Sequence, residues 1–169
     1  MGEVFKIEDE AEIDRIFMDI DVSGDHFERL EAFRASLKSL SWVGTLEFPE
    51  VDILKGFVWC GVIAKYSITF DLSWKLMKDI LIQYHKLSDF AKGSPKVVLK
   101  KSFEADIINS HTWAEMLQVR NEISHEYKNL DSVDDWCAKI SEKYVPLFRE
   151  LSEYAEVKLN EPNQHQPLS

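Results

Sequence analysis

The stretch that decides how this chain folds is Trp113-Ala-Glu-Met-Leu-Gln-Val-Arg-Asn-Glu-Ile-Ser-His-Glu-Tyr127. At about 100° per residue, its apolar side chains share one face of a helix. These side chains are Trp113, Met116, Leu117, Ile123 and Tyr127. Arg120 falls in the middle of that face with Ser124 beside it, although a helix that only packs would carry Leu there, because a buried charge is costly unless it is paired. The sequence therefore predicts a polar site set into a helix interface.

Two interpretations of this polar site are open. Asn121 and His125 form an i, i+4 pair on the flank of the apolar face. In the structural interpretation, Arg120 and His125 only fix the helix register through a carboxylate such as Asp71 or Asp79. In the functional interpretation, the guanidinium, carboxamide and imidazole act together on a ligand.

Apolar periodicity predicts two long helices before this stretch. Residues 26–46 form an amphipathic helix, with apolar residues at spacings of three and four. Residues 51–85 form the longest helix, which is apolar over most of its circumference. Because one bundle can cover only one face of such a helix, we expect the protein to be a homodimer.

Start and stop signals define the remaining helices. Ser94 and Pro95 begin a short helix that should end near residue 108. The pair Thr112 and Glu115 matches a capping box for the helix of the opening stretch. A last helix should cover residues 133–159, with a bend where Pro146 removes a backbone donor.

The resulting fold class is all-α, since no β-alternating run or hairpin dipeptide occurs in the sequence. We expect an up-and-down four-helix bundle with one short extra helix, formed by residues 26–160. Residues 1–25 are an acidic and only weakly periodic N-terminal extension. Residues 161–169, which are rich in Pro and Gln, should be a disordered tail.

The negative charge is concentrated at the N-terminal end. Residues 1–25 carry nine acids against Lys6 and Arg15, which is −7 of the total of −10 and leaves −3 for the rest. Within the bundle, several lysines stand against a single acid, Asp89, and these fit either a phosphate-binding patch or a solvated helix face. The lysines are Lys86, Lys92, Lys96, Lys100 and Lys101.

Several classes of protein and site are excluded by the sequence. We find no signal peptide and no run of about 18 apolar residues that could span a bilayer, so we expect a soluble, cytoplasmic protein with no membrane partner. Cys60 and Cys137 lack metal-binding spacing, and we expect both to be small buried hydrophobes. No common cofactor or catalytic motif is present, so we expect neither a cofactor nor a metal.

Two motifs carry a resemblance to a known family. The order Arg120-Asn121-x-x-x-His125-x-Tyr127 resembles the R-N-x-x-x-H-x-Y signature of HEPN domains. The segment Gly61–Lys78, followed by Thr112 and Trp113 ahead of the motif, is similar to the branch called nucleotidyltransferase substrate-binding proteins. The resemblance covers residues 27–159. Asp71 stands where that family more often has Glu.

The resemblance implies a four-helix-bundle dimer encoded beside a minimal nucleotidyltransferase. In toxin-antitoxin members, the HEPN protein is a metal-independent endoribonuclease that the partner enzyme silences by attaching AMP to the motif Tyr, here Tyr127. In the older description, it is the non-catalytic half of a two-component nucleotidyltransferase and binds a nucleotide or acceptor substrate. The resemblance therefore leaves open whether this chain is an enzyme. This chain lacks the motifs of a nucleotidyltransferase, and the resemblance implies that this partner is encoded by an adjacent gene.

Ribonuclease chemistry would use three side chains of the motif. An imidazole ordinarily titrates near neutral pH, so His125 can move protons at the 2′-hydroxyl or the leaving oxygen of RNA. The guanidinium of Arg120 can stabilise the phosphorane charge, and Asn121 can orient the imidazole ring or a phosphate oxygen. We add as supporting residues Ser124, Asp71 and Trp74.

Overall fold

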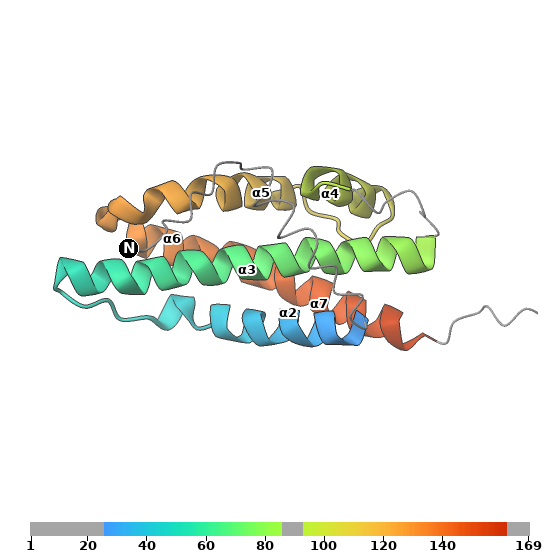
Figure 1. The fold of residues 1–169 in the computed structure, drawn as a ribbon, viewed down its shortest axis with the longest axis horizontal. Helices are drawn as coiled ribbons and strands as arrows, with labels where there is room; N and C mark the ends of the chain where they lie inside the picture. The colour runs from blue at the N-terminus through green and yellow to red at the C-terminus, as the bar shows by residue number, and fades with distance from the viewer. Residues whose placement is uncertain (1–25, 86–92, 162–169) are drawn as a thin grey trace, which may run out of the picture.

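The computed structural model describes residues 26–85 and 93–161, so the expectations for residues 1–25 and for the tail from residue 162 lie outside the described residues. Within that part of the chain every regular element is helical, which confirms the all-α prediction. Helices α2, α3, α5 and the rod made by α6 and α7 run alternately up and down, with α4 as a short extra helix (Figure 1). The bounds are α2 His26–Leu40, α3 Asp52–His85, α4 Pro95–Glu104, α5 Thr112–Glu122, α6 Val133–Lys139 and α7 Val145–Asn160.

Helix α3 is the central element of the bundle. It contacts α2 on one side, α4 and α5 on the other, and α7 behind (Figure 1). Its Tyr66 ring packs 5.7 Å from the ring of Tyr144 and 6.4 Å from that of Phe148, measured between centroids. The ring of Trp113 in α5 meets Phe148 edge-on at 5.5 Å. These aromatic contacts join α3, α5 and α7 into one core.

One face of α3 is apolar and exposed. By length and composition α3 also qualifies as a possible membrane span, whereas the sequence analysis expected none. Only 28% of its most apolar 18-residue window is buried. The exposed residues recur at helical spacing, and we call them the α3 stripe: Ile53, Phe57, Cys60, Ala64 and Ile68. Ile53 and Phe57 are 72% and 73% exposed. Burial by the described residues therefore does not account for the apolar character of this face.

The sequence predicted that both cysteines are buried, and the structure confirms this for only one of them. Cys137 is buried, as expected. Cys60 is exposed, and the expectation of burial was wrong for it. The reason is its angular position on α3, between Phe57 and Ala64 on the side that faces away from the other helices.

Helix α2 ends at Leu40, six residues earlier than predicted. The Ser41 hydroxyl donates to the Leu37 carbonyl at 2.8 Å, and a 3-10 helix follows at Val43–Thr45. Gly44 lies so close to Ser141 that a Cβ at this position would come within 2.8 Å of the Ser141 Cβ. This close approach turns the chain and leaves Trp42 64% exposed, although its spacing predicted an apolar helix face.

Helix α4 also ends early, at Glu104 rather than near residue 108. Asp106 has a φ of 55°, and the Ile107 N–H donates to the Ser102 carbonyl at 2.9 Å. A left-handed residue just after a helix is a common way to end it, and Asp tolerates this conformation better than most residues. The predicted start at Pro95 is confirmed, although Ser94 makes no side-chain cap.

The predicted capping box of α5 is wrong. The Thr112 N–H is satisfied by the Ser110 hydroxyl at 3.2 Å instead. Glu115 turns toward the last rod, where Tyr144 donates to it at 2.7 Å, Lys139 lies at 2.8 Å and Lys143 at 2.5 Å. Hydrogen bonds from the two lysines and Tyr144 lower the pKa of Glu115 to about 2. Two cations and a phenol hold this carboxylate better than one backbone N–H would.

The predicted discontinuity at Pro146 takes the form of a π-helix. Residues Ile140–Tyr144 form this π-helix between α6 and α7, and Pro146 lies in the first turn of α7. Proline cannot donate a backbone hydrogen bond into the preceding turn, so a wider turn there avoids a missing partner. The 3-10 helix at residues 43–45 packs on this π-helix.

Candidate functional site

Three side chains of α3 hold residues 113–127, which we call the motif segment, in place. The Tyr66 hydroxyl donates to the Met116 carbonyl at 2.9 Å, and the Trp59 indole N–H donates to the Glu126 carbonyl at 3.1 Å. Asp71 binds the Arg120 side chain between these two points. The segment is thus fixed before, within and after its polar residues.

Arg120 and Asp71 form a bidentate ion pair. The Arg120 Nε lies 3.1 Å from Asp71 Oδ1, and its Nη2 lies 2.9 Å from Oδ2. The shorter Asp side chain therefore reaches the guanidinium. The two side chains are 40% and 33% exposed, so Arg120 lies at the border of the buried face and not in its middle. Of the two carboxylates considered from the sequence, Asp79 instead binds Arg29, at 2.6 Å and 2.7 Å.

The helix changes type within the motif. α5 ends at Glu122, and residues Ile123–Lys128 continue as a 3-10 helix. A 3-10 helix has three residues per turn, so the i, i+4 relation expected for Asn121 and His125 does not hold. Both side chains are exposed, and within the described residues neither makes a hydrogen bond. Ser124 is exposed as well.

The apolar residues of the opening stretch mostly pack as predicted. Trp113, Met116 and Ile123 are buried, and Leu117 is half-buried. For Tyr127 the structure describes only the backbone, which belongs to the 3-10 helix Ile123–Lys128.

The supporting residue Trp74 lies on α3 one turn after Asp71 and is half-buried. Its indole N–H is enclosed but has no hydrogen-bond partner among the described residues. The Lys75 Nζ lies 5.9 Å from the centroid of its ring. Trp59 and Trp113, by contrast, are fully packed core residues, as their spacing predicted.

The arrangement has hydrogen-bond donors that can bind an anion. Asp71 occupies two of the five N–H donors of Arg120, so the remaining three can meet phosphate oxygens. His125, five residues further along the segment, is exposed and can accept or donate a proton. Among residues 26–85 and 93–161, no three His, Cys, Asp or Glu side chains cluster in a way that could hold a metal ion.

The lysine cluster suggested by the sequence is only partly described. Lys86, Asp89 and Lys92 lie outside the described residues. In α4, the Glu104 carboxylate lies 2.6 Å from Lys101 and 4.0 Å from Lys100. This carboxylate neutralises part of the positive charge, which favours the solvated helix face over a phosphate patch.

Sequence reasoning missed the positioning roles of Trp59 and Tyr66. Both residues belong to the apolar-periodic run of residues 51–85, and both are buried. The signal available was chemical, because a buried indole N–H or phenol usually finds an acceptor. Here both acceptors are backbone carbonyls of the motif segment.

Comparison with known proteins supports the resemblance drawn from the two motifs. The family model described as nucleotidyltransferase substrate binding protein like matches residues 28–157. No curated protein matches the chain. The matched range includes α3, α5 and every residue of the candidate site. The chain therefore belongs to the nucleotidyltransferase substrate-binding protein-like family.

Proposed function

We propose that this chain is the HEPN-domain partner of a minimal nucleotidyltransferase and acts as a latent, metal-independent endoribonuclease. The family name implies association with a nucleotidyltransferase. The observation that carries the ribonuclease proposal is the half-exposed Arg120, which Asp71 fixes on the same anchored segment that carries the exposed His125. Asp71 engages two of the five N–H donors of Arg120, which leaves three available to a phosphate.

In the proposed reaction, the 2′-oxygen of RNA attacks the adjacent phosphorus and the 5′-oxygen leaves. His125 takes the 2′-hydroxyl proton while water protonates the leaving 5′-oxygen, or it protonates the leaving oxygen while water takes the 2′-hydroxyl proton. Arg120 binds the equatorial phosphate oxygens, whose negative charge grows in the phosphorane. Asn121 donates its carboxamide hydrogens to a phosphate oxygen. The products are a 2′,3′-cyclic phosphate and a 5′-hydroxyl.

The proposal includes a homodimer that packs on the α3 stripe. The stripe presents large apolar side chains at Ile53, Phe57 and Ile68, with the smaller Cys60 and Ala64 between them. Asp71 continues the same face by one turn, so the stripe leads directly to the Arg120 pair. A second copy on this surface would bury the stripe and bring its own Arg120 and His125 close to the first set.

The proposed regulation is addition of AMP to Tyr127 by the partner enzyme in the cytoplasm. Tyr127 lies in the motif, and the 3-10 helix that contains its backbone ends one residue later. An added phosphate would compete with RNA for Arg120. Incubation with the neighbouring nucleotidyltransferase, ATP and Mg²⁺ should add one or a few AMP masses to the wild type and none to Tyr127→Phe. Equal labelling of both proteins would place the site elsewhere.

Expression without the nucleotidyltransferase tests the ribonuclease proposal. Wild-type chain should stop growth, and coexpression of the partner should restore it. His125→Ala should abolish toxicity, whereas His111→Ala, which changes another exposed histidine, should leave it intact. Unimpaired growth with wild-type chain at the same protein level would contradict the proposal.

The alternative function is a non-catalytic subunit that binds a nucleotide or acceptor substrate for the partner enzyme. Two observations favour it: the family is described by substrate binding, and no described residue orients the His125 ring. In that case His125→Ala and Arg120→Ala should weaken nucleotide binding, measured by calorimetry, while RNA stays uncut by either variant or the wild type.

A further inference from the structure

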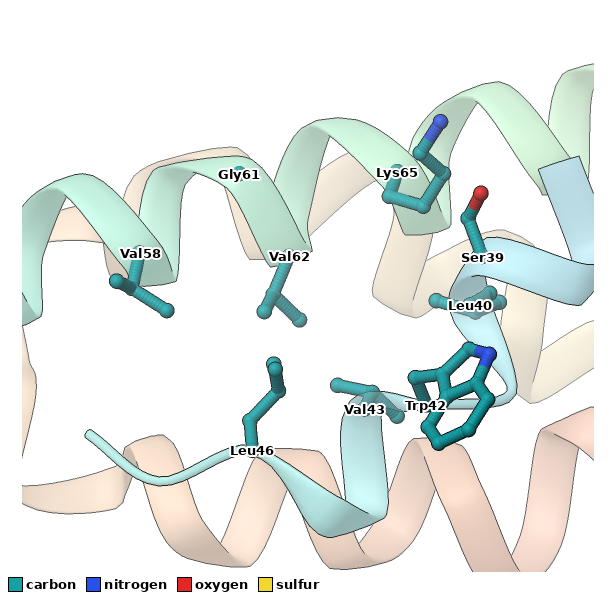
Figure 2. A pocket seen from close by; sticks show the side chains of 9 residues that line it. All are labelled: Ser39, Leu40, Trp42, Val43, Leu46, Val58, Gly61, Val62 and Lys65. Atoms are coloured by element: carbon teal, nitrogen blue, oxygen red, sulfur yellow. The ribbon is translucent and has the colours of Figure 1, made fainter.

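A groove beside α3 is separate from the motif site. Trp42, Val43 and Leu46 form one wall, and Val58 and Val62 of α3 form the other. Figure 2 shows the two valines of α3 pointing across the gap toward Leu46 and Val43, with Lys65 and Ser39 at the end nearest α2. We call it the Trp42 groove. Its volume is about 210 Å³, and Lys65 is the only charged residue among those that line it.

The groove is held open by the fold. The close contact of Gly44 with Ser141 fixes the 3-10 helix Val43–Thr45 against the π-helix Ile140–Tyr144. This contact keeps Trp42 outward at 64% exposure. On the opposite wall, a Cβ on Gly61 would meet nothing within 4 Å, so glycine leaves space there. An exposed indole in a preformed apolar groove is typical of a surface that receives an apolar side chain.

The size and charge of the groove limit what can fill it. Small-molecule pockets usually enclose about 300–1,000 Å³, so 210 Å³ better fits one or two side chains of a peptide segment. The apolar walls require an apolar anchor. Lys65 at the rim favours carboxylates beside that anchor.

We propose that the Trp42 groove binds the acidic N-terminal segment of the same chain, with Ile16 and Phe17 as the anchors. Ile13, Ile16, Phe17 and Ile20 recur at spacings of three and four, and acids flank them in sequence. The segment of residues 1–25 carries a net charge of −7, from nine acids and two bases. Its carboxylates can approach Lys65 and the exposed Lys38 at the end of α2.

The connection is long enough for this contact. The groove lies at the Leu40 end of α2, about 21 Å from His26 at 1.5 Å per helical residue. Nine residue steps from Phe17 to His26 can span about 30 Å when extended. The segment therefore reaches the groove without any change in α2. Binding there would shield Trp42 and leave the α3 stripe open for a second copy.

The test is a cysteine pair in the full chain. Met18→Cys, which leaves the anchors Ile16 and Phe17 in place, is combined with Val58→Cys in a Cys60→Ser background, and Cys137 is left in place because it is buried. The control pairs Met18→Cys with Val157→Cys, on an exposed position of α7. Val157 follows Glu156, which binds Arg34 of α2, so a segment with no binding site would reach it at least as easily as the groove.

The thiols are oxidised with diamide, and the products are separated on a non-reducing gel. We expect the 18–58 disulfide within one chain to form about tenfold faster than the 18–157 disulfide, because docking raises the effective concentration of the thiol. Equal rates, or a faster control, would overturn the proposal. A disulfide between two chains would also overturn it and identify a second copy as the occupant.

Acrylamide quenching of Trp42 provides a second measurement without cysteines. The Trp42 contribution is obtained by subtracting the signal of Trp42→Phe from that of the otherwise identical protein. Phe17→Ser should raise the quenching of Trp42, whereas Phe5→Ser, which changes a phenylalanine outside the proposed anchor, should not. If Phe17→Ser leaves the quenching of Trp42 unchanged but added nucleotidyltransferase lowers it, the proposal is overturned. The nucleotidyltransferase would then be the occupant of the groove.

Discussion

Replacing Asp71 with Asn tests whether α3 holds the motif segment through Arg120. Exposed ion pairs contribute about 0.2–1 kcal/mol, and hydrogen bonds to charged groups about 1.5–3 kcal/mol when buried. The Asp71–Arg120 pair is bidentate and half-exposed, so we expect a coupling of about 1 kcal/mol. For a chain of this size, that loss lowers Tm by about 2–4 °C.

The coupling is measured with a double-mutant cycle of Asp71→Asn, Arg120→Gln and both together. Urea unfolding followed by circular dichroism gives the free energy of unfolding of each variant at one protein concentration. Asp79→Asn with Arg29→Gln is the matched cycle, because those side chains are only 13% and 19% exposed. The coupling energy between Asp79 and Arg29 should be larger than that between Asp71 and Arg120. A coupling below about 0.3 kcal/mol at Asp71–Arg120, within the error of additivity, would refute the positioning role.

Three further perturbations follow from the packing. The lowered pKa of Glu115, about 2, means that its ionised form stabilises the fold fully above its ordinary titration range. The stability difference between wild type and Glu115→Gln should therefore shrink as the pH falls from 5 to 2 in urea titrations; a constant difference would contradict the pairing. Gly44→Ala should lower the free energy of unfolding by about 1–3 kcal/mol through the clash with Ser141. Gly56→Ala is the control and should not destabilise, because a Cβ there meets nothing within 4 Å. Phe57→Asp should convert the proposed dimer to a monomer in light scattering, and Val157→Asp should not; a wild type that is already monomeric at micromolar concentration would contradict the dimer.

Much of the fold could be predicted from local sequence signals. The long apolar-periodic run predicted α3 to within a residue at its start, and Pro95 correctly marked the start of α4. Helix ends were predicted less well, because they depend on contacts between distant segments. α2 stops at Leu40, shortly before Gly44 meets Ser141, and α4 stops at Glu104, two residues before Asp106 adopts a left-handed conformation.

The candidate site was predicted in its composition but not in its geometry. The sequence placed Arg120 on a buried face and suggested a carboxylate partner, and Asp71 fills that role. The change from α-helix to 3-10 helix at Ile123 could not be read from periodicity, and it moves His125 away from its expected pairing with Asn121. Glu115 looked like a local cap, but the lysines that bind it lie in the last rod, far along the chain.

The most direct test of the central proposal is cleavage of RNA by the purified chain in excess EDTA, with the product ends identified by mass spectrometry. The proposal predicts fragments with 2′,3′-cyclic phosphate and 5′-hydroxyl ends, formed without metal. His125→Ala should slow their formation by about a hundredfold or more, because the proton-transfer group is lost, while its Tm stays unchanged because the side chain is exposed. Intact RNA with the wild-type chain, or an unchanged rate with His125→Ala, would contradict the proposal.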